Sequence, residues 1–328
     1  MKKSNWLFYF LLIMSTLITI SANNWMSMWM GLELNMMSFI PLILQKNSKS
    51  SSEAAMIYFL IQSISSIILF MMITINLLKL LNYSNMINML ITISILMKLG
   101  AAPFHKWMPE IMTKMSGMKC MILMTWQKMA PLMMICNLNS NMMLIKLSII
   151  WSVGVGSIGG INQSSLRKLM AYSSINHLGW MLAINKKINL WLMYWMIYSM
   201  IIFMICLMFN NYKLLFLNQI SSSNMNNPEK ISMFIMMLSM GGLPPFIGFL
   251  PKWITIQTMI NSKEFMTLFF MIMFSLVTLM FYMRVMTNMY LSFNSSIKWV
   301  TINQSKMMTM MIMLINFSLP LIIIMDIF

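Results

Sequence analysis

The chain has 328 residues, of which 59 % are hydrophobic and only 9 % are charged. Soluble domains carry about 25 % charged residues, so a chain this poor in charge cannot cover a water-facing surface. Disorder is excluded as well, because disordered segments have low hydrophobicity. The net charge of +16 is expected in loops on one side of a membrane and does not indicate nucleic-acid binding. The composition therefore predicts an integral membrane protein with many spans.

The residues that could hold a redox centre are few. The chain has 3 cysteines (Cys120, Cys136 and Cys206) and 2 histidines (His105 and His177). An iron–sulfur cluster needs about four thiolate or mixed Cys/His ligands, so we expect no metal and no bound cofactor in this chain. The 50 methionines act as flexible apolar residues, and the genetic code of animal mitochondria would produce such an excess.

Apolar stretches long enough to cross a membrane, which takes about 20 residues, recur along the whole chain. Eleven spans are expected, at residues 4–22, 25–45, 54–80, 86–105, 118–137, 142–161, 166–185, 188–210, 231–260, 265–292 and 306–327. The connections are short and polar, so residues 1–328 are expected to form a single integral membrane domain. The start of the chain resembles a secretory signal, but the next span follows almost at once, so the first helix is expected to be retained.

Basic residues in the predicted loops are divided unevenly between the two sides of the membrane. Thirteen lie on the side of the N-terminus and five on the opposite side. The positive-inside rule therefore places the N-terminus in the cytoplasm or in its mitochondrial equivalent, the matrix. An odd number of spans then places Asp326 and the C-terminus across the membrane.

One apparent nucleotide-binding motif lies in an apolar stretch. Gly154, Gly156 and Gly159 have the spacing G-x-G-x-x-G, which indicates dinucleotide binding only between a strand and a helix. Inside a spanning helix, small residues allow neighbouring helices to approach closely. We interpret these glycines as helix-packing residues.

Four ionisable groups fall well inside the predicted spans: Glu33, Lys98, Lys128 and Lys252. A charge at the centre of a spanning helix costs roughly 2.5–3.5 kcal/mol on insertion scales. Arg284 lies near enough to a helix end for its side chain to reach the interface, but the other four are too deep for all of them to do so. We interpret the four as functional groups, with purely structural ion pairs as the alternative.

Two predicted spans contain helix-breaking sequences next to a lysine. Residues 97–105 contain Gly and Pro, and residues 241–252 contain three of each. Proline removes a backbone donor and clashes with the preceding turn, so both helices should be interrupted within the membrane, where broken backbone is buried or lines a cavity. The broken spans are five apart, which inverts their direction and predicts inverted repeats at residues 4–137 and 142–292, followed by a terminal helix at 306–327.

The buried ionisable groups favour proton transfer as the chemistry. A lysine in an apolar environment gives up its proton more readily than one in water, and Glu33 would keep Lys98 charged when the two lie close. His105 and His177 are candidates for extending a relay, although a single histidine in a span is as often a packing residue. The hydroxyl groups that could continue such a relay belong to Tyr172, Ser173 and Ser174.

Five blocks of sequence, in order along the chain, carry a family resemblance. They are residues 29–41 (WMGLELNMMSFIP), 98–107 (KLGAAPFHKW), 125–131 (TWQKMAP), 173–180 (SSINHLGW) and 241–253 (GGLPPFIGFLPKW). The chain resembles the mitochondrial NADH dehydrogenase (ubiquinone) subunit 2 family, antiporter-like membrane subunits of respiratory complex I. Beyond these blocks the C-terminal quarter resembles the family only in hydropathy.

The resemblance implies an all-α, antiporter-like fold of eleven helices in the mitochondrial inner membrane, with the C-terminus in the intermembrane space. It implies that Glu33, Lys98, Lys128 and Lys252 form a central proton-translocation axis. His105 and His177 match the family less firmly, as possible members of the proton relay. NADH, FMN, the iron–sulfur clusters and ubiquinone would then belong to other subunits of the complex. The expected partners are antiporter-like subunit 4, small subunit 4L and membrane lipids.

Two other functions remain open from the residues alone. A subunit of a cation/proton antiporter would share the fold and the buried lysines. A scaffold protein would use the buried charges only to hold helices together. Because the alternatives share the apolar helices, experiments must test what the buried charges do.

Overall fold

The structure is a computed structural model that describes residues 3–44, 48–78, 84–138, 142–222, 225, 227–290 and 306–320. Within these ranges the chain forms fifteen α-helices and one 3₁₀ helix. The β-structure in the described part of the chain is one isolated bridge between Ser165 and Phe216. The predicted all-α class is confirmed, while Asp326 and the end of the predicted terminal helix lie outside the described residues.

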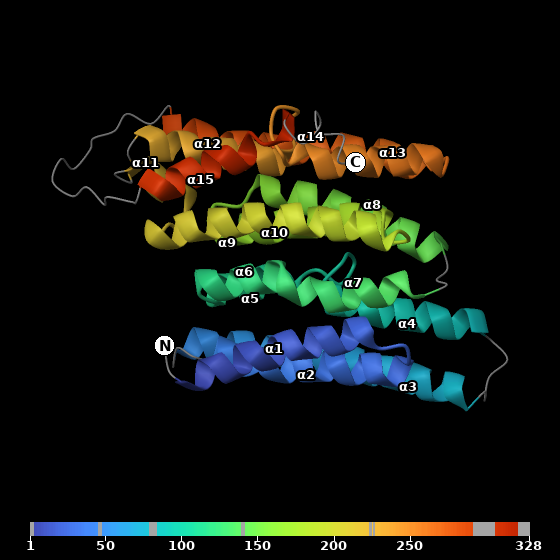
Figure 1. Ribbon diagram of the computed structural model, residues 1–328. Helices are drawn as coiled ribbons and strands as arrows, with labels where there is room; N and C mark the ends of the chain where they lie inside the picture. The colour runs from blue at the N-terminus through green and yellow to red at the C-terminus, as the bar shows by residue number, and fades with distance from the viewer. Residues whose placement is uncertain are drawn as a thin grey trace. The chain divides into compact units, whose positions relative to one another are not determined.

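The chain divides into two compact units (Figure 1), residues 1–152 with 185–188 and residues 153–184 with 189–328. The helices that begin in the first unit are α1 (Lys3–Ser21), α2 (Trp25–Ile43), α3 (Lys49–Leu77), α4 (Ser84–Leu99), α5 (Trp107–Lys114), α6 (Gly117–Met124), the 3₁₀ helix η1 (Trp126–Lys128), α7 (Met129–Cys136) and α8 (Met142–Ile161). Those of the second unit are α9 (Leu166–Ala183), α10 (Ile188–Asn211, whose first residue is counted with the first unit), α11 (Leu217–Ser222), α12 (Asn227–Gly241), α13 (Phe249–Asn261), α14 (Phe265–Tyr290) and α15 (Lys306–Asn316).

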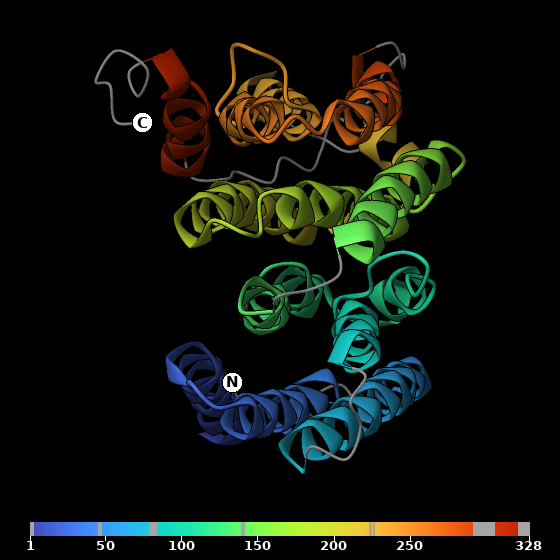
Figure 2. The same ribbon diagram turned by 90° about the vertical axis from the view of Figure 1, so that its right-hand side faces the viewer.

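In the first unit, α1 packs along α2, and α3 packs against α2, α4 and α5, as the end-on view in Figure 2 shows. Gly31 lets α1 and α2 approach closely, because a Cβ atom there would lie 2.4 Å from Cγ2 of Thr19 and 3.1 Å from the carbonyl oxygen of Ser15. Small residues at such contacts are typical of helix packing in membranes. Helices in lipid have no hydrophobic driving force to associate and depend on close van der Waals packing.

In the second unit, α12 packs against α14 and α15, and α13 against α14 and α9. The predicted packing role of the glycines in α8 is confirmed. A Cβ atom on Gly156 would lie 2.6 Å from the backbone nitrogen of Asn176, and one on Gly159 would lie 2.4 Å from Cε1 of Tyr172. Both neighbours belong to α9, so Gly156 and Gly159 allow the close contact between α8 and α9, whereas Gly154 faces Phe274 of α14.

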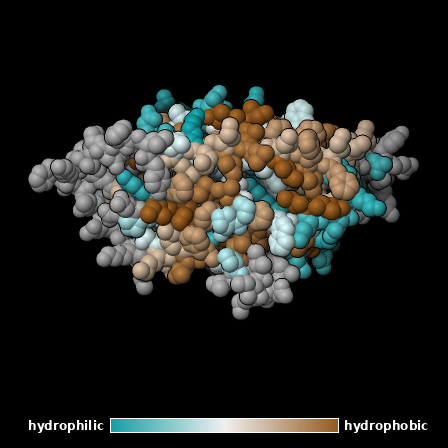
Figure 3. Space-filling view, turned by 90° about the horizontal axis from the view of Figure 1, so that it is seen from above, coloured by the Kyte–Doolittle hydropathy of each residue, from teal (hydrophilic) through white to brown (hydrophobic). Residues whose placement is uncertain are grey.

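Four helices in the described part of the chain are individually long and apolar enough to cross a membrane: Lys49–Leu77, Met143–Ile161, Ile188–Asn211 and Phe265–Asn288. Helix α14 of the second unit exposes large apolar side chains such as Met266 and Met280. Figure 3 shows apolar residues gathered on one face of the second unit. The count of eleven spans stays a prediction, because two of the predicted spans, 118–137 and 231–260, are divided into shorter helices.

The predicted interruptions beside Lys98 and before Lys252 are confirmed, and both helices end in the same way. Gly100 has φ +70° after α4, and Gly242 has φ +77° after α12. The amide of Gly100 bonds to the carbonyl of Met97, and that of Gly242 to the carbonyl of Ser239. The next amide in each case bonds five residues back, which completes a Schellman motif that favours glycine at the left-handed position.

Two basic side chains close the carboxyl ends of helices. Arg284 of α14 donates to the carbonyl oxygens of Ile161 and Gln163, where α8 ends. Lys119, one of the thirteen basic residues that the sequence assigns to loops on the side of the N-terminus, is instead buried with 5 % exposure. Its Nζ donates to the carbonyl of Ile43 at 3.0 Å. The last carbonyls of a helix have no partner within it and carry partial negative charge, so cations are favourable there.

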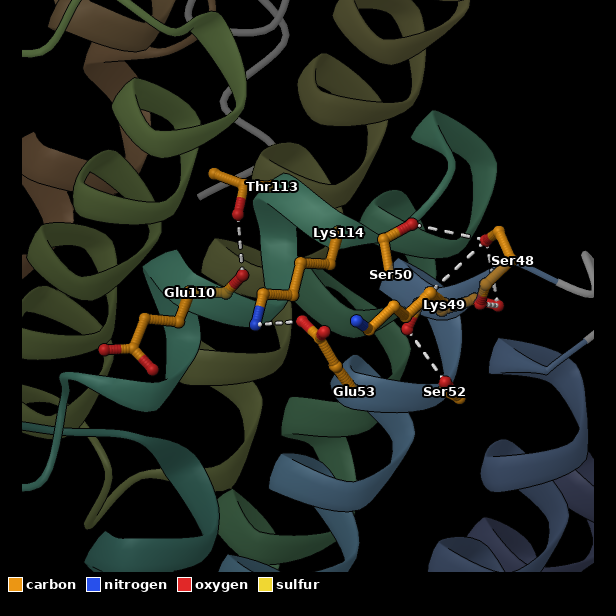
Figure 4. A network of polar contacts seen from close by, with 9 residues as sticks. Ser48, Lys49, Ser50, Ser52, Glu53, Glu110, Thr113 and Lys114 are labelled. Carbon is orange, nitrogen blue, oxygen red and sulfur yellow. Dashed lines mark hydrogen bonds and ion pairs between the residues drawn. The ribbon is translucent and has the colours of Figure 1, made fainter.

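An ion pair joins the start of α3 to the end of α5 (Figure 4). Nζ of Lys114 lies 3.0 Å from Oε2 of Glu53, and Ser48 caps α3 by accepting from the amide of Ser51. Both charged side chains are partly exposed, so the pair contributes at most about 1 kcal/mol. The sequence assigns the loops that contain these residues to the side of the membrane that carries the N-terminus and most basic loop residues.

At the start of α13, a close backbone contact holds the interrupted segment against α12. A Cβ atom on Gly248 would lie 1.7 Å from the carbonyl oxygen of Ser239. We expect Gly248→Ala to destabilise the protein by about 3 kcal/mol, because backbone atoms cannot move aside. Thermal unfolding in detergent should show a lower Tm than Gly154→Ala, whose methyl group would meet only the Phe274 ring at 3.4 Å. Equal Tm values would contradict this contact.

Candidate functional site

Lys98 lies in the last turn of α4, immediately before the interruption at Gly100. Its side chain is buried, with 6 % exposure. Nε2 of Gln62 in α3 donates to its backbone carbonyl at 3.2 Å, which satisfies one of the acceptors that the end of a helix leaves open. The broken helix thus holds a lysine side chain inside the first unit.

Lys128 lies at a third interruption, which the sequence analysis missed. Helix α6 ends at Met124, η1 covers Trp126–Lys128, and α7 begins at Met129. Pro131 explains the break, because its ring has no N–H to bond the carbonyl of Gln127 and would clash with it in a continuous α-helix. The Lys128 side chain is only 1 % exposed.

Lys98 and Lys128 line one cavity in the first unit, with a volume of about 20 Å³ for the centres of water molecules. A cavity of this size holds about one water molecule. Its walls are formed by α2, α3, α4, α5, α6, η1 and α7. The lining residues are Leu32, Asn35, Met36, Tyr58, Gln62, Lys98, Leu99, Trp107, Met108, Leu123, Gln127, Lys128 and Pro131. The structure therefore brings together two of the lysines that the sequence singled out.

Glu33 lies near the middle of α2 and is half-buried. Its carboxylate attracts the Lys98 ammonium group electrostatically, as the sequence led us to expect. It is not one of the lining residues, whereas Leu32 and Asn35 on the same helix are. Glu33 therefore lies outside the cavity lining, and its interaction with Lys98 is electrostatic.

A chain of polar side chains on the cavity wall was not assigned a role from the sequence. The Tyr58 hydroxyl donates to Oε1 of Gln127 at 3.3 Å, and Nε2 of Gln127 donates to Oδ1 of Asn35 at 2.9 Å. The only sequence signal was that Asn35 and Gln127 are polar residues inside apolar spans, each within two residues of an ionisable group.

Lys252 lies in the first turn of α13 in the second unit and is 5 % exposed. Its Nζ donates to the carbonyl oxygen of Gly241 at 2.6 Å and lies 5.7 Å from the centroid of the Trp180 ring. The end of α12 supplies the acceptor, and the aromatic face adds a cation–π attraction. Gly242 makes the approach possible, because a Cβ atom there would lie 2.7–2.9 Å from Cδ, Cε and Nζ of Lys252.

The two histidines lie in different surroundings. His177 of α9 is buried, and its Nδ1 is 2.7 Å from the Tyr194 hydroxyl, with the Tyr198 ring centroid 4.8 Å away. His105 is half-buried in the segment between α4 and α5, with Nδ1 3.1 Å from the carbonyl of Pro103, and does not line the cavity. Within the described residues, no group of three His, Cys, Asp or Glu side chains could hold a metal ion.

Comparisons with known proteins agree on one family. The transmembrane family described as NADH:quinone oxidoreductase/Mrp antiporter matches residues 22–281. The NADH-ubiquinone oxidoreductase chain 2 of Anopheles gambiae is 46 % identical over 313 residues, which cover 92 % of this chain and 91 % of that protein.

Solved structures share the fold at much lower identity. A chain of respiratory complex I from Thermus thermophilus superposes with a TM-score of 0.81 at 17 % identity, covering 97 % of this chain and 79 % of that one. A chain of the Mrp complex from Dietzia sp. DQ12-45-1b gives a TM-score of 0.77 at 14 % identity, covering 87 % of this chain and 60 % of that one. The antiporter-like fold is thus shared with both complexes. By its sequence, this chain belongs to the NADH-ubiquinone oxidoreductase chain 2 family.

Proposed function

We propose that this chain is a membrane subunit of a proton-translocating NADH:ubiquinone oxidoreductase, respiratory complex I, in the mitochondrial inner membrane. The observation that carries the proposal is the cavity shared by Lys98 and Lys128, in a chain that is 46 % identical to an NADH-ubiquinone oxidoreductase chain 2. Its part in the reaction is to move protons, coupled to electron transfer from NADH to ubiquinone in other subunits.

In the proposed transfer, Lys98 and Lys128 exchange a proton through one water molecule. The water accepts a proton from the ammonium group of one lysine and gives one to the neutral amine of the other. The cavity volume of about 20 Å³ is sufficient for this water. Glu33 biases the exchange, because its carboxylate stabilises the charged form of Lys98.

Lys252 is the proposed proton carrier of the second unit. Its ammonium group is held by the Gly241 carbonyl and the Trp180 ring, two interactions that favour the charged state. The His177–Tyr194 pair in the same unit is a candidate for extending the relay. His105 is a weaker candidate, since it does not line the cavity that the two lysines of the first unit share.

The proposal also covers orientation, arrangement and partners. The positive-inside rule places the N-terminus in the matrix and the C-terminus in the intermembrane space, with eleven spans arranged as inverted repeats. Subunits 4 and 4L are the proposed neighbours, and lipids contact the remaining apolar surface. NADH, FMN, the iron–sulfur clusters and ubiquinone are assigned to other subunits of the complex.

A cation/proton antiporter subunit is the second candidate, supported by the fold shared with the Mrp complex. The sequence relation favours complex I, because the identity is 46 % to the Anopheles gambiae chain and 14 % to the Mrp chain. We expect the tagged chain to purify from mitochondrial membranes with a large assembly that oxidises NADH. Purification in a smaller complex without NADH oxidation, but with Na⁺-dependent proton exchange in vesicles, would support the antiporter instead.

Replacing a cavity lysine should uncouple the complex. We expect Lys98→Met or Lys128→Met to lower proton translocation by about tenfold or more, which corresponds to about 1.4 kcal/mol. The variant chain should still purify with the NADH-oxidising assembly. The control is Lys187→Met, which removes an exposed lysine from the α9–α10 connection. Normal proton translocation in assembled complexes carrying Lys98→Met would favour a scaffold role for the buried charges.

Lys252 offers an independent test through its glycine neighbour. We expect Gly242→Ala to lower proton translocation several-fold, because the methyl group would displace Lys252 from the Gly241 carbonyl. The positive φ adds about 1–2 kcal/mol of backbone strain. Gly241→Ala is the matched comparison, since it keeps the carbonyl and its methyl group would meet no atom closer than 3.7 Å. If both variants translocate protons equally well, the position of Lys252 does not matter.

A further inference from the structure

The hydrogen-bonded chain Tyr58–Gln127–Asn35 joins three separate elements around the cavity. Tyr58 belongs to α3, Gln127 to η1 and Asn35 to α2. The two bonds, of 3.3 Å and 2.9 Å, meet at the Gln127 amide. Tyr58 and Asn35 are each 3 % exposed, and the Tyr58 ring is fixed edge-on between Phe39 and Trp107, with centroids 5.2 Å and 6.2 Å away. Gln127 is therefore held from both sides by ordered groups.

Few backbone bonds hold the turn at Gln127, and one of them runs from the amide of Met129 to the carbonyl of Trp126. Pro131 has no N–H with which to bond the Gln127 carbonyl. The amide of Lys128 reaches the carbonyl of Thr125 only at 3.4 Å, beyond the usual range of 2.7–3.2 Å for such bonds. The two side-chain bonds of Gln127 supply a restraint at the residue immediately before Lys128.

An amide suits this position because it both donates and accepts while remaining neutral. Each end of Gln127 is used in this way, with Oε1 accepting from Tyr58 and Nε2 donating to Asn35. A carboxylate could not donate, and an ammonium group could not accept. The Gln127 amide therefore orients Tyr58 and Asn35 without carrying a proton itself.

We propose that Gln127 is a positioning residue for Lys128. Its bonds to Asn35 and Tyr58 fix the 3₁₀ turn, so that the Lys128 side chain enters the cavity that it shares with Lys98. The proposal rests on the function proposed above, in which these two lysines exchange a proton. It adds that the exchange depends on a neutral amide that takes no proton.

The central variant is Gln127→Leu, studied in the intact complex reconstituted into vesicles. Loss of a hydrogen bond worth about 1 kcal/mol should lower proton translocation about fivefold and shift its pH profile, while the variant chain still purifies with the NADH-oxidising assembly. Asn35→Leu keeps the bond from Tyr58 to Gln127 and should lower translocation less, and the double variant should be no worse than Gln127→Leu, because Gln127→Leu already breaks both bonds. Tyr58→Phe removes only the longer bond and should lower translocation about twofold.

Two comparisons separate positioning from a general structural role. Met37→Leu changes an exposed side chain on the same helix as Asn35 and should behave like the parent complex. In a Lys128→Met background, Gln127→Leu should lower translocation no further, because it acts through Lys128. A further loss in that background, or an unchanged pH profile in the single variant, would overturn the proposal.

The outcomes also distinguish this inference from the proposed function. If Lys128→Met leaves translocation normal, the lysine pair is not the proton path and the proposed function fails. If Lys128→Met abolishes translocation and Gln127→Leu leaves it unchanged, only the positioning role fails. Should Gln127→Leu prevent assembly, Tyr58→Phe and its pH profile decide the matter, since that variant keeps the bond between Gln127 and Asn35.

Discussion

A lysine ammonium group inside an apolar helical protein needs hydrogen-bond acceptors, and an intact helix offers few because its carbonyls are already bonded. Helix ends are the exception, since their last carbonyls are open and carry partial negative charge. Lys252 bonds to the last residue of α12 and Lys119 to the last residue of α2. Arg284 bonds at the end of α8. Lys119 and Lys252 can therefore be buried because helices end inside the protein, and the partly exposed Arg284 is held in the same way.

The glycines and prolines of the sequence are what create these ends. Gly100 and Gly242 adopt positive φ and close Schellman motifs, so α4 and α12 stop where most other residues would be strained. The same two positions are crowded: a Cβ atom would lie 3.0 Å from the Trp107 ring at Gly100 and 2.7 Å from Lys252 at Gly242. Each glycine thus ends a helix and leaves room for the group packed against it.

The sequence predicted these interruptions and the burial of all three lysines, because Gly, Pro and a charge within an apolar stretch each have a direct structural consequence. It did not predict the break at Gln127, since a single proline three residues after Lys128 is compatible with the first turn of a helix. Nor did it assign roles to Tyr58, Gln62 or Asn35. Their contacts join residues 36 to 92 positions apart, and no local pattern specifies such pairs.

Lys128 lies at the start of a helix, as Lys119 and Lys252 do, but those two bond to the last residue of another helix. Lys128 precedes the first turn of α7, where the backbone presents N–H donors instead of carbonyl acceptors. Its acceptors must therefore come from other elements or from water, and the cavity is where they can reach it. Lys252 is bonded at 2.6 Å to the carbonyl of Gly241 at the end of α12. The two lysines therefore differ in what faces the ammonium group: a helix-end carbonyl at Lys252, and a cavity shared with Lys98 at Lys128.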